Sequence, residues 1–152
     1  MRLLTRGLRY VWALPNSAIG AVLGIVVVAC GGWARVVDGV LEIGGGWLGA
    51  LASRLAWSRR FSAITLGHVV LGVSRASLQS ARTHEHVHVR QYERWGPFFL
   101  PLYLGSSLLQ WVLGRRPYHD NHFERAACAG ATRHRRRTRH EGSRSAGSGG
   151  GG

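Results

Sequence analysis

The sequence predicts an α+β fold, and three observations support that prediction. Residues 10–34 contain no charge until Arg35 and have the length and hydropathy of a membrane-spanning helix. Asp38-Gly39 lies between two short runs of β-branched residues, which is a strong signal for a β-hairpin. No glycine or proline occurs from Ser74 to Trp95, a stretch that reads as helix. We therefore expect an N-terminal transmembrane helix, a small β-hairpin or meander and further helices.

The N-terminal segment divides into a basic leader, residues 1–9, and the apolar helix over residues 10–34. Trp12 and Trp33 stand near its ends, where aromatic side chains anchor a span at the membrane interfaces. Two alternatives stay open, a cleaved signal peptide and a lipoprotein leader that ends at Cys30. Membrane lipid is the partner that this segment predicts.

The length and net charge of the chain are those of one basic domain with an unusual tail. The chain has 152 residues and a formal net charge of +13, and all 20 of its basic residues are arginine. Much of the charge lies in residues 132–152, an Arg/His run followed by Gly/Ser, which predicts disorder. An anion-binding tail is the alternative, but no aromatic residues are interleaved, so we expect no specific nucleic-acid partner. The two cysteines, Cys30 and Cys128, give no indication of a disulfide framework.

Residues 61–73 read as a strand directly before the longest helix expected after the N-terminal one. That helix is predicted over residues 77–95, because Gly96-Pro97 ends it. A strand beside it offers an edge on which an extended peptide could pair. The arrangement therefore admits a polypeptide substrate.

The motif H-E-x-x-H lies in this helix, as His84, Glu85 and His88. Residues four apart share one helix face, so the two imidazoles point to one place, as two ligands of a tetrahedral zinc ion do. Glu85 stands beside them, where a carboxylate can take a proton from zinc-activated water without binding the metal. The pattern is typical of a zinc metalloprotease, with Zn²⁺ as cofactor.

A second apolar segment follows, predicted as a helix over residues 97–114, and then a short helix that carries Glu124, with Asp120 or Asn121 at its cap. The apolar segment is marginal for crossing a bilayer. If it crossed, Glu124 would lie across the membrane from His84 and His88. A shared site therefore requires the segment to be re-entrant or packed on the motif helix.

With His84-Glu85-x-x-His88 and a downstream Glu124-x-x-Ala127, the chain resembles the gluzincin group of zinc metallopeptidases. It is also similar, from about residue 14 to 127, to small uncharacterised bacterial membrane proteins with a motif like H-E-x-V-H-V-R-Q-Y-E-R-W-G-P. The resemblance implies a zincin-like domain over residues 35–131 in a bacterial cell membrane. It implies His84, His88 and Glu124 as zinc ligands and Glu85 as general base.

The chain departs from the gluzincin pattern at Cys128, where many members have an aspartate that orients a ligating histidine. Asp120 is the local substitute that we expect. Further candidates for the surroundings of the site or for oxyanion binding are Tyr92, Tyr118, His119 and His122. The predicted function is peptide-bond hydrolysis, and the alternative is a catalytically inactive metal-binding membrane protein that acts in interaction or assembly.

Overall fold

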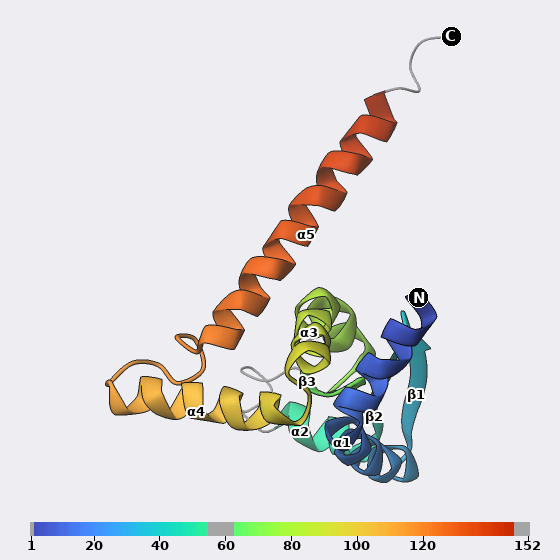
Figure 1. Cartoon of the computed structure of the whole chain (residues 1–152). Coiled ribbons are helices and arrows are strands. Elements are labelled where there is room, and N and C mark those ends of the chain that lie inside the picture. Colours follow the sequence, from blue (N-terminus) through green and yellow to red (C-terminus); the bar gives the residue numbers. More distant parts are fainter. Residues whose placement is uncertain (1, 55–62, 148–152) are drawn as a thin grey trace.

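The computed structural model describes residues 2–54 and 63–147 and shows a mixed helix and strand protein with one small sheet (Figure 1). The elements follow one another as α1 (Arg2–Ala29), β1 (Gly32–Val37), β2 (Val40–Gly45), α2 (Gly46–Arg54), β3 (Ala63–Leu66), β4 (Val69–Gly72), α3 (Arg75–Trp95), η2 (Gly96–Phe98), α4 (Phe99–Val112) and α5 (His122–Gly147). The coarse α+β prediction is confirmed.

The four strands form one sheet in the order β1-β2-β4-β3. β1 and β2 make the expected hairpin, and Asp38 and Gly39 both take positive φ in its turn, at 51° and 80°. β3 and β4 are a second antiparallel hairpin, and β2 and β4 pair in parallel. The crossover that parallel pairing requires runs through α2.

Helices α1 and α3 cover opposite faces of this sheet. Successive strand residues face opposite sides, so neighbouring residues of one strand contact different helices. Val70 packs in a core cluster with Val40 and with Leu78 and Val89 of α3. Its neighbour Val69 faces α1, and a Cβ built on Gly20 of α1 would lie only 2.8 Å from the Cβ of Val69. The missing side chain therefore lets α1 approach the sheet closely.

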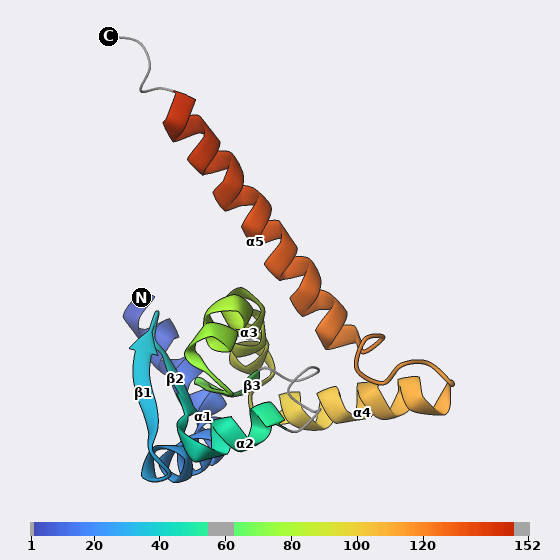
Figure 2. The same cartoon turned by 180° about the vertical axis from the view of Figure 1, so that it is seen from behind.

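Helix α3 begins with a capping box, in which Ser74 and Ser77 each accept from the other's backbone amide. It ends at Trp95, where Gly96-Pro97 leads into η2, as expected. Helix α4 follows directly, and α5 returns to pack beside α3 before it projects away from the rest of the molecule (Figures 1 and 2). A second apolar cluster, Ala13, Tyr92 and Phe99, joins α1, α3 and α4.

Two boundary predictions need correction. The apolar N-terminal helix ends at Ala29 rather than at residue 34, because Gly31 turns the chain and Trp33 belongs to β1. The single strand expected over residues 61–73 is a hairpin, since Gly67, at φ 62°, reverses the chain; residues 61–62 lie outside the described part. The stretch from Gly7 to Ala29 is long and apolar enough to cross a membrane.

The helix that carries Glu124 is long, not short, and it continues through the arginine run expected to be disordered. Arginine is a good helix former, and Arg137 pairs with Glu141 one turn later at 2.9 Å. The predicted tail is therefore helical from residue 132 to Gly147, and residues 148–152 lie outside the described part.

Candidate metal centre

Helix α3 places the two motif histidines on one face, as the spacing predicts. His84 and His88 lie one turn apart with their ring centroids 4.8 Å apart and the rings edge to face. Their Nε2 atoms are 3.1 Å apart. The side chain of His88 is almost buried, whereas His84 is about one-fifth exposed, so the pair borders solvent on the His84 side.

Glu124 reaches the same point because the chain folds back after α4. That helix has 14 residues, and α5 begins at His122 after a turn in which Asn121 is fully buried. The amide of Asn121 donates to the Tyr103 carbonyl and the Ser107 hydroxyl, and its oxygen accepts from the Phe123 amide. The cap therefore fastens the first turn of α5 to α4 and sets the position of Glu124.

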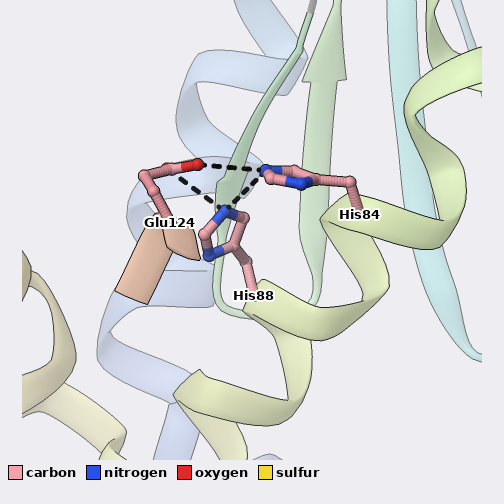
Figure 3. Close-up of side chains that lie close together, drawn as sticks. All are labelled: His84, His88 and Glu124. Carbon is pink, nitrogen blue, oxygen red and sulfur yellow. Dashed lines mark hydrogen bonds and ion pairs between the residues drawn. The ribbon is translucent and has the colours of Figure 1, made fainter. Parts of the chain in front are cut away.

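The three candidate ligands converge on one point, and Figure 3 draws the contacts between them, with each histidine against a different oxygen of the carboxylate. His84 Nε2 lies 3.2 Å from Glu124 Oε2, and His88 Nε2 lies 3.3 Å from Oε1 of the same carboxylate. Ligands about 2.0–2.1 Å from a tetrahedral ion are separated by roughly 3.3 Å, so a zinc ion fits this spacing. His84, His88 and Glu124 are a group that could hold a metal ion.

The carboxylate between the rings has an unsatisfied oxygen, which supports the same conclusion. Oε2 of Glu124 is buried and accepts no well-aligned hydrogen bond, although His84 Nε2 is close. Burial raises the pKa of Glu124, but the two adjacent imidazoles and the Tyr103 hydroxyl lower it by more, so the carboxylate is ionised. A buried anion with a free lone pair facing two imidazoles is a site for a cation.

Neighbouring side chains orient the ligands unequally. Nδ1 of His88 lies 2.8 Å from Gln91 Oε1, and the amide nitrogen of Gln91 donates to the Phe123 carbonyl. The hydroxyl of Tyr103 donates to Oε1 of Glu124 at 2.6 Å. Among the described residues, Nδ1 of His84 is paired only with the Cys128 sulfur, at 3.9 Å. His88 and Glu124 are therefore firmly positioned and His84 less so.

Glu85 lies in the same cavity as the ligands, bound to the sheet. Its Oε2 accepts a hydrogen bond from the Thr65 hydroxyl of β3 at 2.7 Å. The cavity has a volume of about 160 Å³, enough for a few water molecules or a small group. Its lining is mostly apolar or aromatic: Ile64, Leu66, Tyr92, Phe99, Leu100, Tyr103 and Tyr118, with Thr65, Glu85 and the three ligands.

The other predicted candidates divide into two groups. Tyr92 and Tyr118 line the cavity. Burial, and then the charge of Glu124, raise the pKa of Tyr118, so this phenol remains a proton donor. His119 and His122 are exposed side chains outside the lining.

Asp120 is not the substitute for the missing aspartate. Its carboxylate accepts from the Arg116 amide at 2.9 Å and caps the turn before α5 instead of contacting a ligand. The position aligned with that aspartate, Cys128, is the one that lies against His84.

Sequence reasoning missed Gln91, Tyr103 and Thr65. Gln91 follows His88 by three residues on the same helix, and this spacing could have identified it. Tyr103 has the only phenol in an uncharged, mostly apolar helical segment, a weaker signal. Nothing in the local sequence marks Thr65, whose contact with Glu85 depends on the packing of β3 against α3.

Comparisons of the chain with protein-family models, with curated proteins and with solved structures give no match. The gluzincin resemblance therefore stays a prediction, and the geometry of the site is what indicates a function.

Proposed function

We propose that this protein is a zinc-dependent metallopeptidase-like hydrolase attached to a membrane. One observation carries the proposal: two imidazole nitrogens lie 3.1 Å apart, and each lies 3.2–3.3 Å from an oxygen of one carboxylate, in a cavity that also contains Glu85. Two histidines and a glutamate with an open fourth position are the ligand set of a catalytic, rather than a structural, zinc site.

His84, His88 and Glu124 would hold the ion. Bound zinc supplies Lewis acidity, which polarises a carbonyl and lowers the pKa of water. The part of Glu85 is to accept a proton from the attacking water and pass it to the leaving amine. The Thr65 hydroxyl holds one Glu85 oxygen, which leaves the other for this transfer.

A polypeptide is the substrate that the surroundings favour. β3 is an edge strand of the sheet that the described residues form, and its residues Ile64 and Thr65 line the cavity. Ile64 is 55% exposed, so a peptide could pair with β3 and present its bond to the ligands. Tyr118 is the donor that we assign to the developing oxyanion.

The direct test is Glu85→Gln in protein purified in detergent. We expect the variant to keep its zinc and to lose hydrolysis of a quenched-fluorescent peptide library by about 10²–10⁴-fold, because a positioned general base contributes that much. The control is Gln79→Met, a substitution on the exposed side of α3, which should keep full activity. Unchanged hydrolysis in Glu85→Gln would exclude Glu85 as the base.

The contact between Cys128 and His84 favours a second candidate, a metal-binding protein without catalysis that acts in assembly. A thiol at 3.9 Å orients an imidazole less firmly than a carboxylate does. Zinc binding in the wild type with no hydrolysis of the peptide library would select this alternative.

A further inference from the structure

Helix α4 has its polarity reversed relative to a helix on a water-soluble protein. Its polar side chains face the protein: Tyr103 donates to Glu124, and the Ser106 and Ser107 hydroxyls accept from His122 and Asn121. Its opposite side carries large apolar residues that are 41–69% exposed, namely Leu102, Leu104, Leu108, Leu109, Trp111 and Val112. An apolar helix face of this size requires an apolar partner.

Helix α1 shows the same reversal. Small or polar residues, Ala13, Asn16, Gly20 and Gly24, form its buried side. Large aliphatic residues point outward: Ile19 is 52% exposed, Val22 63%, Ile25 69% and Val26 50%. Small residues at helix interfaces and large apolar ones outside are the arrangement of proteins in lipid.

α1 is nevertheless bound to the rest of the fold along its length. It contacts all four strands. Near its start Arg9 pairs with Glu93 and the Tyr10 hydroxyl donates to the Gly39 carbonyl; further along, the Asn16 amide donates to the Gly96 carbonyl. If α1 crossed a bilayer, the sheet and its polar turns would enter hydrocarbon, where unpaired strand edges are very costly. α1 therefore cannot span while this packing is kept.

The exposed apolar helices lie on one side of the molecule. In Figures 1 and 2 the second half of α1, α2 and α4 form the lower side, and α5 leads the arginine run upward, away from it. α2 adds Trp47 and Leu51, which are 58% and 45% exposed. Arg115 and Arg116 follow the end of α4 and are exposed, in a position to meet lipid phosphates.

We propose that α1, α2 and α4 together seat the protein on one leaflet of a phospholipid bilayer, with none of the described helices crossing it. α4 is about 21 Å long, too short to span and suited to lie in the interface. Leu100 and Tyr103 of α4 line the metal cavity, so the cavity lies directly beside a helix that would rest on the lipid. If the proposed hydrolase function holds, its substrates are polypeptide segments next to the membrane.

Vesicle binding tests the surface with a matched pair of variants. Val112 of α4 and Val36 of β1 are both 69% exposed. Full-length protein is diluted from detergent onto preformed phosphatidylethanolamine/phosphatidylglycerol vesicles, and its partitioning is measured by flotation. We expect Val112→Glu to weaken binding about tenfold and Val36→Glu to leave it unchanged. Equal binding by both variants would overturn the proposal, as would a wild type that fails to float and elutes as a dimer, with a second copy covering α4.

Side-specific labelling tests the absence of a span. Gly7→Cys stands at the first residue of the apolar stretch of α1, where the added side chain meets no neighbour within 4 Å, and Val36→Cys stands in β1, beyond the end of that stretch. In a Cys30→Ser, Cys128→Ser background on sealed vesicles, both positions should react with an impermeant maleimide to the same extent before and after lysis. Labelling of one position only after lysis would show that α1 crosses and would overturn the proposal. Neither assay depends on zinc or hydrolysis, so failure here is distinct from failure of the proposed enzyme.

Discussion

The orientation of His88 depends on a single neighbouring amide. Gln91 Oε1 lies 2.8 Å from Nδ1 of His88 and is placed to accept its proton, so Nε2, beside Glu124 and His84, is the nitrogen that can bind a metal. The amide end of Gln91 is itself held by the Phe123 carbonyl on α5. Gln91 thus selects the imidazole tautomer that can bind a metal.

We expect Gln91→Met to weaken zinc binding by about 10–100-fold, because His88 loses the acceptor that fixes its ring. Chelator competition on purified protein measures this affinity. Gln91→Glu keeps an acceptor and should stay near wild type, and Gln79→Met, the same change on the exposed side of α3, should have no effect. Wild-type affinity in Gln91→Met would mean that the amide does not position the ring.

At the residue scale, local spacing determined what could be predicted. His84 and His88 are fixed relative to one another by one helical turn, and the structure brings them together with Glu124 as the three-ligand hypothesis requires. Asp120 was the wrong substitute, because its carboxylate caps a turn on Arg116. Thr65 was out of reach, since its contact with Glu85 depends on how a strand packs on a helix.

At the scale of elements, the buried carboxylate of Glu42 joins β1, β2 and α3. It lies in β2, pairs with Arg35 of β1 at 2.7 Å and with Arg82 of α3 at 2.7 Å, and is 1% exposed. Burial raises the pKa of Glu42, but hydrogen bonds and charge from Arg82 and Arg35 outweigh it and hold the pKa below the ordinary value. This pairing keeps the metal-bearing helix in place over the sheet.

A carboxylate whose pKa is lowered by folding stabilises the protein above its unfolded pKa, and that contribution is lost as the pH falls through the folded pKa. In the wild type, the free energy of unfolding should therefore decrease as the pH drops below about 4.5. Glu42→Gln should lower the free energy of unfolding at pH 7 by only about 1–3 kcal/mol, because both arginines stay partly hydrated. The variant should also have a flatter acid limb, because the carboxylate that protonates there is gone.

Denaturant titrations from pH 3 to pH 7 measure both effects, roughly spanning the range in which carboxylates protonate. Glu141→Gln, at an exposed pair on α5, is the control and should keep the wild-type profile. An acid limb that is equally steep in Glu42→Gln would assign it to other groups.

The elements themselves were predictable where turn chemistry is strong. Asp38-Gly39 and Gly96-Pro97 mark their boundaries clearly, and both are found as expected. The hairpin at Gly67-His68 was missed because its flanking residues are apolar on both sides, as both faces of the sheet are covered. The length of α5 was missed because composition indicated disorder, whereas arginine supports helix.

At the scale of the whole molecule, the site exists only because α4 sends the chain back. His88 and Glu124 are 36 positions apart, and the uncharged segment between them had to turn rather than cross a membrane for the ligands to meet. The same helix presents its apolar side outward, so one element both closes the site and forms the proposed lipid surface. The sequence allowed a re-entrant or packed segment but could not choose the geometry.

The most direct test of this account is the zinc content of the purified protein beside two matched variants, Glu124→Gln in the cavity and Glu141→Gln on the exposed part of α5. Elemental analysis after dialysis should give one zinc per chain for the wild type and Glu141→Gln. Glu124→Gln should retain little, because an amide replaces the only anionic ligand. Equal zinc in both variants, or none in the wild type, would contradict the three-ligand site and with it the proposed hydrolase.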